Sequence, residues 1–329
     1  FYGVNDIVYI IDRFDKPVLL KDIMRIFKSP EAAVRLEDGN MYNYIAAHEF
    51  LLPVNKENVR KYKIVPEKYM DMVPDTIKLS ISKGKRYLDK TELMMLDLLS
   101  NYNWDRPLYI FQKGGDINMG IKDYLMYNGM AYKFVPIRHK SEEQDAFMDE
   151  DAMYDMVMNK YRFDNFANTE LNYDYQHILS FNTLVSYRNL HTNIAEGLFA
   201  AGKMDKAMAV LDKMQERFPS KSLPLNNVAI SNVNDKAVLN AICLYLNMNA
   251  NEKAEKLADE FIEETLLGID LFSQMVRGDF ISADGIQQCF VYLTYLEEAF
   301  KESGNIAKAQ EISDTIDRYL APLKEYYED

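Results

Sequence analysis

The spacing of apolar side chains early in the chain predicts short strands and one helix. Residues 7–11 form a compact apolar run, and residues 50–54 form another, as expected of buried strands. Residues 77–81 alternate between apolar and polar side chains, which is the period of a strand with one buried face. Residues 20–27 repeat apolar side chains at helical spacing and stop at Ser29-Pro30, where the proline disfavours further helix.

Two helix-then-strand pairs follow. The first helix is amphipathic, and Asp89 or Thr91 stands before its apolar face as an N-cap. Alternation of helix and strand is typical of a parallel or mixed sheet covered by helices. We therefore predict an α+β (or α/β) N-terminal domain with a mixed sheet over residues 1–165. The two pairs are a helix at 91–99 with a strand at 106–111, and a helix at 120–127 with a strand at 130–137.

From Ser186 to the end the pattern is helical, and it repeats. A tight turn followed by an Ala recurs at residues 202–207, 249–254 and 304–309, and a small residue there lets two antiparallel helices approach closely. This arrangement resembles tetratricopeptide repeats, although the three Ala residues are 47 and 55 residues apart, against a usual period of about 34. Residues 166–329 are thus predicted to form an all-α, tetratricopeptide-like helical domain, with a plain helical bundle as the alternative.

Charge and hydropathy exclude two broad classes. The 38 basic and 51 acidic side chains give a net charge of −13, which argues against a general nucleic-acid binder because phosphate contacts require a basic surface. No apolar run reaches the roughly 18 to 20 residues that span a bilayer. The first six residues lack the basic and apolar blocks of a signal peptide and an initiator Met. We expect the chain to be part of a longer protein.

Sequence motifs for catalysis or metal binding are incomplete. None of the four His residues forms a pair at metal-ligand spacing. Gly115 and Gly120 have the separation of a P-loop, but Ile121-Lys122 stands where Lys followed by Ser or Thr is required. The acidic residues 149–151 lack the Gly and Glu of an EF-hand loop and are interpreted as a solvated helix start. We therefore predict no catalytic residue, no metal and no cofactor in this chain.

Two cysteines are too few for a disulfide scaffold. Cys243 and Cys289 both lie in apolar, helical contexts. Buried free thiols are the favoured interpretation, and a disulfide in an oxidising compartment is the alternative.

One stretch carries a family resemblance. Leu96-Asp97-Leu98-Leu99, then residues 103–110 (Asn-Trp-Asp-Arg-Pro-Leu-Tyr-Ile) and residues 128–136 (Asn-Gly-Met-Ala-Tyr-Lys-Phe-Val-Pro) resemble the soluble C-terminal region of a bacterial multi-pass membrane protein family of unknown function. The membrane half of that family resembles GT-C-type glycosyltransferases and is related to a eukaryotic transmembrane protein O-mannosyltransferase. The resemblance implies an extracytoplasmic (periplasmic) tail at the inner membrane, whose catalytic carboxylates lie in membrane loops outside this sequence.

Six residues are candidates for binding. Trp104, Arg106 and Tyr109 belong to the resembling stretch and would hold a sugar or polyprenyl phosphate if they face a groove, whereas packing of the turn is their structural alternative. Tyr245, Phe261 and Phe300 occupy repeat positions and would line a concave helical surface, with repeat core as the alternative.

Three functions remain open at this point. The first is a non-catalytic accessory domain of a membrane-embedded glycosyltransferase-like protein that binds acceptor protein, glycan, lipid-linked sugar or a partner subunit. The second is a free-standing helical-repeat scaffold for protein–protein interaction. The third is a small-molecule enzyme that uses the loop at residues 113–122.

Overall fold

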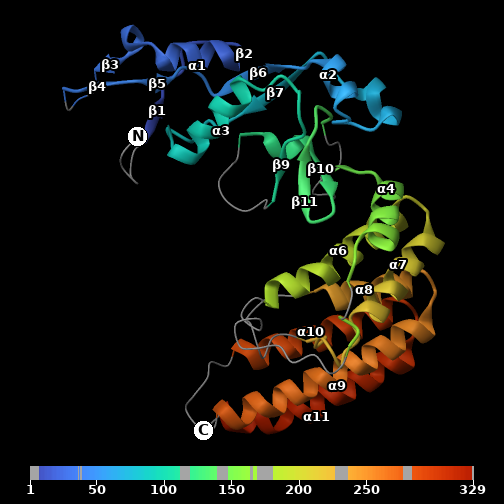
Figure 1. The fold of residues 1–329 in the computed structure, drawn as a ribbon. Helices are drawn as coiled ribbons and strands as arrows, with labels where there is room; N and C mark the ends of the chain where they lie inside the picture. The colour runs from blue at the N-terminus through green and yellow to red at the C-terminus, as the bar shows by residue number, and fades with distance from the viewer. Residues whose placement is uncertain are drawn as a thin grey trace. The chain divides into compact units, whose positions relative to one another are not determined.

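The computed structural model describes residues 7–35, 37, 39–111, 119–138, 147–163, 166–168, 181–226, 236–276 and 284–327. The chain divides into two compact units, an N-terminal unit of residues 1–149 and a C-terminal unit of residues 150–329 (Figure 1). The domain boundary after residue 165 stays a prediction. The expected order, a region with mixed sheets followed by a helix-rich region, is confirmed.

The N-terminal unit contains several small sheets in place of one large one. In three of them a central strand has one parallel and one antiparallel neighbour, so these sheets are mixed, as predicted. β1 (Val8–Ile10) lies between β5 (Tyr44–Ile45) and β8 (Tyr87–Leu88), β6 (Glu49–Pro53) lies between β2 (Val18–Leu19) and β7 (Thr76–Ser80), and β3 (Val34–Arg35) pairs with β4 (Met41–Tyr42).

The fourth sheet corrects one predicted element. Residues 120–127 do not form a helix: a 3-10 turn, η3 (Ile121–Tyr124), leads directly into strand β10 (Leu125–Asn128). Gly129, with a φ of 72°, then turns the chain back into β11 (Ala131–Phe134). Asn-Gly after an apolar run is a hairpin signal, and it outweighs the weak helical spacing before it. The strand order is β12 (Phe147–Met148), β10, β11 and β9 (Tyr109–Ile110).

Two helices cover the sheets of this unit. α3 (Lys90–Ser100) begins at Asp89, whose carboxylate accepts from the backbone N–H of Glu92 while the Glu92 side chain accepts from the N–H of Asp89. This capping box satisfies two donors that the first turn leaves unpaired. α1 (Leu20–Lys28) packs against α3, and Lys28 pairs with Asp97 at 2.6 Å. Short helical segments are η1 (Pro30–Ala32), α2 (Lys56–Lys61) and η2 (Glu67–Met72).

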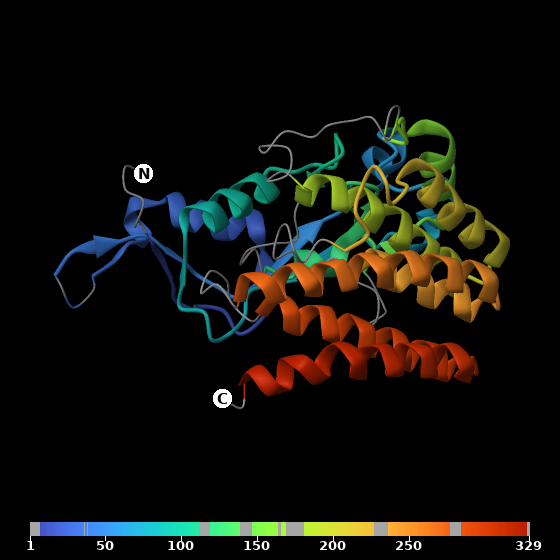
Figure 2. The same cartoon turned by 90° about the horizontal axis from the view of Figure 1, so that it is seen from below.

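The C-terminal unit is built from successive antiparallel helix pairs. α6 packs against α7, α8 against α9, and α10 against α11. In addition, α8 packs against α6, and α10 packs against α8 and α9. Figure 2 shows α9, α10 and α11 side by side in orange to red. The helices are α4 (Glu150–Asp155) with the π-helical segment η4 (Met156–Lys160), α6 (Phe181–Ala200), α7 (Met204–Arg217), α8 (Ala237–Asn247), α9 (Asn251–Val276), α10 (Asp284–Glu302) and α11 (Ile306–Tyr327).

The same turn joins the two helices of every pair. Gly202, Asn249 and Gly304 adopt φ values of 74°, 59° and 86°, the left-handed conformation that ends many helices. The residue after each turn donates its N–H to the carbonyl five positions earlier, at Leu198, Tyr245 and Phe300. Ala207, Ala254 and Ala309 are buried at the start of each second helix, as their small size requires.

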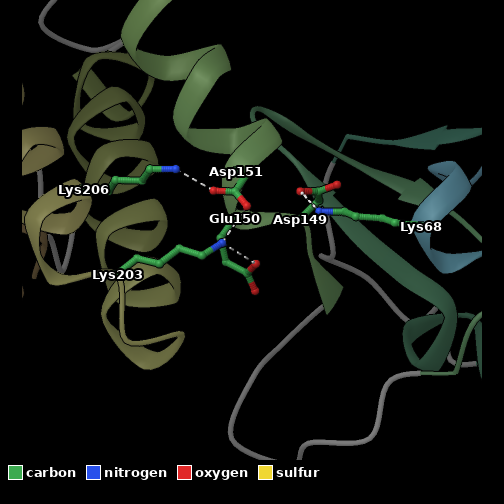
Figure 3. A network of polar contacts seen from close by, with 6 residues as sticks. All are labelled: Lys68, Asp149, Glu150, Asp151, Lys203 and Lys206. Carbon is green, nitrogen blue, oxygen red and sulfur yellow. Dashed lines mark hydrogen bonds and ion pairs between the residues drawn. The ribbon is translucent and has the colours of Figure 1, made fainter.

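Acidic residues mark the boundary between the units, and each pairs within its own unit (Figure 3). In the N-terminal unit, Lys68 pairs with Asp149 at 2.8 Å, and that hydrogen bond raises the pKa of Lys68. Asp149 is buried, so the interpretation of residues 149–151 as wholly solvated is wrong at this position. The helix start is confirmed, because α4 begins at Glu150.

Within the C-terminal unit, Asp151 accepts from two lysines of the α7 region. Lys203 and Lys206 lie 2.8 and 2.7 Å from its carboxylate oxygens (Figure 3). These hydrogen bonds lower the pKa of the half-exposed Asp151 to about 2. The pairs tie the first turn of α4 to the start of α7.

Candidate functional site

Trp104 lies in the turn after α3 and is fully buried. Its ring stacks on Phe134 with ring centroids 5.3 Å apart, and its indole N–H donates to the carbonyl oxygen of Pro53 at 2.9 Å. The backbone of Trp104 has a φ of 57°, which a non-glycine residue adopts only where its surroundings hold it. The indole joins the α3–β9 turn to β6 and β11, and it has no exposed surface in this structure.

Arg106 and Tyr109 follow on the surface of the same unit. Arg106 is exposed, and its carbonyl accepts from the hydroxyl of Tyr102 at 2.6 Å. Tyr109 is 48% exposed on β9, an edge strand, and Phe111 two positions later is 70% exposed. The structure therefore separates Arg106 and Tyr109 from the buried Trp104. Sequence reasoning missed Phe111, which directly follows β9, although its two-residue offset from Tyr109 is the period of a strand.

Tyr245 connects three helices of the C-terminal unit from a buried position. Its hydroxyl donates to Asp212 of α7 at 2.9 Å and accepts from Gln215 at 2.7 Å. Lys253 of α9 binds the same Asp212 carboxylate at 2.7 Å. Burial is the largest cause that raises the pKa of Tyr245.

Phe261 and Phe300 are also fully buried. The ring of Phe261 in α9 contacts that of Tyr292 in α10, with centroids 6.0 Å apart. Phe300 occupies the same place in its turn as Tyr245 does in the preceding one. These aromatic side chains hold consecutive helices together, so the lining of a helical surface comes from other residues.

Three stripes of half-buried and exposed side chains run along α6, α8 and α10 on one face, which we call the α6–α8–α10 face. Along each helix these residues are three or four positions apart, so they share one side of it. Hydrogen bonds join the stripes: Asn240 donates to Glu196 at 3.2 Å, and the Cys243 thiol donates to the Tyr295 hydroxyl at 3.9 Å. The stripes comprise Asn189, Asn193, Glu196 and Ala200 of α6, Asn240, Cys243 and Asn247 of α8, and Val291, Tyr295, Glu298 and Glu302 of α10.

The acid–base groups of this face influence one another. Burial raises the pKa of the Glu196 carboxyl, and the hydrogen bond from Asn240 opposes that shift. The pKa of Tyr295 is raised, first by the neighbouring Cys243 and in part by Glu196 and Glu302. Burial raises the pKa of Cys243, with smaller contributions from the same two carboxylates. Groups from three helices thus lie within electrostatic range of each other.

The loop at residues 113–122 is described only from its end. Residues 113–118 lie outside the described residues, and with them the Gly115 part of the P-loop comparison. Gly120 has a φ of 71°, and a Cβ there would lie 2.9 Å from the backbone nitrogen of Ser80. That nitrogen donates to the carbonyl of Met119. Gly120 is therefore required by the close approach of the loop to β7.

Cys243 and Cys289 are both free thiols, as the favoured interpretation predicted, but only Cys289 is buried, whereas Cys243 is half-buried. Among the residues that the structure describes, no group of three or more His, Cys, Asp or Glu side chains could hold a metal ion. Within those same ranges, no helix combines the length and the apolar composition needed to cross a membrane.

Comparison with known families finds one similarity. Residues 1–152 match the family model of the TMEM260-associated domain 2, so this stretch is similar to that domain. The match ends close to Asp149, the last residue of the N-terminal unit, and α6 to α11 lie beyond it. No curated protein and no solved structure matches the chain at a significant level.

Proposed function

We propose that this chain is a non-catalytic accessory region of a TMEM260-like membrane protein. The single observation that carries the proposal is the similarity of residues 1–152 to the TMEM260-associated domain 2. The family resemblance of residues 96–99, 103–110 and 128–136 supports it and adds that the parent protein is glycosyltransferase-like. On that basis the chain lies on the extracytoplasmic side of the membrane, and the catalytic carboxylates belong to the membrane-embedded half.

The helical unit is proposed to be a short, irregular array of tetratricopeptide-like repeats. Three antiparallel helix pairs joined by the same left-handed turn support this, together with a buried Ala after each turn. The irregular spacing of the pairs follows in part from helix length, since α9 has 26 residues and α7 has 14. Arrays of this kind bind segments of other proteins on the face lined by alternate helices.

The proposed role of the helical unit is to bind acceptor protein or a partner subunit on the α6–α8–α10 face. The amides of Asn193, Asn240 and Asn247 offer donors and acceptors to a peptide backbone. Tyr295 is 41% exposed and offers an aromatic surface beside them. Glycan or lipid-linked sugar is the other ligand class, for which the exposed Tyr109 of β9 and Phe111, just after that strand, are the candidate surface.

Two measurements test the proposal. The open reading frame that encodes this chain should contain roughly eight or more spans of about 20 apolar residues if the parent is a membrane transferase. Binding of acceptor peptides and of a glycan array to the 329-residue chain should then be measured by titration. Absence of both kinds of binding at millimolar concentration would remove the accessory role.

A free-standing interaction scaffold is the second candidate function. It is favoured by one observation: the family match stops at residue 152, so the helical unit lies outside it. A reading frame without membrane spans, combined with capture of a defined partner by the helical unit, would establish this alternative over the first.

A further inference from the structure

We propose that the α6–α8–α10 face binds an extended protein segment that carries Lys or Arg side chains, with Glu196, Tyr295 and Glu302 surrounding one cationic group. The inference deepens the proposed function, on which it rests, by naming the chemistry of the bound segment. It is argued from the charge of the face, from the burial of Glu196 and from the side chains beside that carboxylate.

The charge of the face has one sign. Its three stripes contain Glu196, Glu298 and Glu302, and none of their residues is Lys or Arg. Residues 181–329 as a whole carry 14 basic and 23 acidic side chains, so the rest of the helical unit adds to the negative potential. Complementary charge steers association and selects among partners, and an acidic segment would be repelled here.

Glu196 lies on the α6 stripe of the face and is half-buried. Asn240 is its one hydrogen-bond partner among the contacts of the described residues, and an amide N–H does not neutralise a carboxylate. A partly desolvated anion is stabilised when a cation reaches it. The raised pKa of Glu196 agrees with this incomplete compensation.

Tyr295 and Glu302 approach the same place from α10. Both Glu196 and Glu302 raise the pKa of Tyr295, so both carboxylates lie within electrostatic range of its hydroxyl. An ammonium or guanidinium group over a tyrosine ring is attracted by its π electrons, and a nearby carboxylate adds an ion pair. The asparagines on α6 and α8 then remain available for the backbone of the segment, which requires an extended conformation to expose its amides.

The test uses the whole chain and three labelled peptides that differ only in charge: Lys, Gln or Glu alternating with Gly and Ser. The Lys peptide is expected to bind about tenfold more tightly than the Gln peptide, and the Glu peptide more weakly still. Glu196→Gln keeps the hydrogen bond with Asn240 but removes the charge, and it should weaken binding of the Lys peptide about tenfold. Raised salt should weaken the same complex.

The matched control is Glu252→Gln, which removes an exposed carboxylate from α9, outside the face. It should leave binding of the Lys peptide unchanged, and circular dichroism should be identical for both variants and the parent. Protection of Cys243 from alkylation by the bound peptide locates the complex on the face.

The outcomes separate the inference from the proposed function. Equal binding of the Lys, Gln and Glu peptides, each with protection of Cys243, would overturn the preference for cations and leave a peptide-binding face. Loss of binding in Glu252→Gln as large as in Glu196→Gln would show a non-specific charge effect and also overturn it. Failure of all three peptides to protect Cys243 would overturn both proposals for this face.

Discussion

His191 in α6 is a buried imidazole held in its neutral form. One ring nitrogen contacts the carbonyl oxygen of Tyr187 at 2.7 Å, and the other lies 3.1 Å from a guanidinium nitrogen of Arg217, which donates to it. Burial is the largest cause that lowers the pKa of His191 to about 4, and the charge of Arg217 adds to it. A second proton on this buried ring would have no solvent beside it, and no carboxylate of the described residues contributes to its pKa.

The pH dependence of stability follows from that shift. In the unfolded chain the histidine titrates near about pH 6.5, so the unfolded state takes up the proton first as pH falls. The stability contribution of neutral His191 is therefore complete above about pH 6.5 and is lost progressively down to about pH 4, by about 3 kcal/mol in total. Denaturant titrations at about pH 7.5 and about pH 4.5 should show this loss.

The variant His191→Gln provides the control. Its amide can donate to Tyr187 and accept from Arg217, but it does not titrate. Its stability should fall less than that of the parent over the same pH interval. An identical fall in both proteins would show that other groups carry the acid sensitivity.

The two thiols should differ in reactivity. Cys289 is buried in α10, and burial raises its pKa to about 11, whereas Cys243 is only half-buried on the α6–α8–α10 face. Thiolates are the reactive species, and they must be reached by the reagent. In the native chain, iodoacetamide should modify Cys243 before Cys289, as peptide mass mapping would record. Equal rates in the native chain would contradict this burial, and equal rates in denaturant are the expected control.

At the scale of the helix, the Tyr245 hydroxyl should contribute to the packing of α7 against α8. Tyr245→Phe leaves the buried ring but removes the donor to Asp212 and the acceptor for Gln215. We expect a loss of about 1 to 2 kcal/mol in the free energy of unfolding. Tyr295→Phe makes the same chemical change at a side chain that is 41% exposed, and it should cost less than about 0.5 kcal/mol. Equal losses of stability in the two variants would show that the cost does not come from the hydrogen bonds of the Tyr245 hydroxyl.

The sequence predicts a helix or strand correctly where the residues next to that element mark where it begins and ends. The spacing of residues 91–99 predicts a helix capped by Asp89 or Thr91, and α3 begins at Lys90 with a capping box at Asp89. The helix predicted at 120–127 is wrong because Leu125-Met126-Tyr127 reads equally well as a strand. Its pairing with β11 and β12 decided the outcome, and such pairing depends on residues distant in sequence.

The candidate site is harder to predict than the helices themselves. A repeat pattern in the sequence does not show which side of a helix is covered by the neighbouring helix pair. Tyr245, Phe261 and Phe300 were recognised as repeat positions, and all three are buried between helices. Asn240 and Tyr295 carry no sequence signal of their own. Their role becomes visible only in the folded chain, where hydrogen bonds join α6 to α8 and α8 to α10.

Each of the two units should fold without the other. The C-terminal unit has its own core, which includes Ile194, Leu211, Ile242 and Leu293 from four different helices. Expressed alone, residues 150–329 should give a helical circular dichroism spectrum and a cooperative thermal transition. A molten, non-cooperative product would contradict this and would mean that the core depends on residues 1–149.

Trp104 is the single tryptophan of the chain, and it lies in the core of the N-terminal unit. Its fluorescence therefore reports on that unit alone, with the blue-shifted emission of a ring shielded from water. The far-ultraviolet dichroism of the same sample comes mainly from the long helices α6 to α11 of the other unit. The native chain thus contains two independent optical signals, and a single melting experiment without any label would reveal which unit unfolds first.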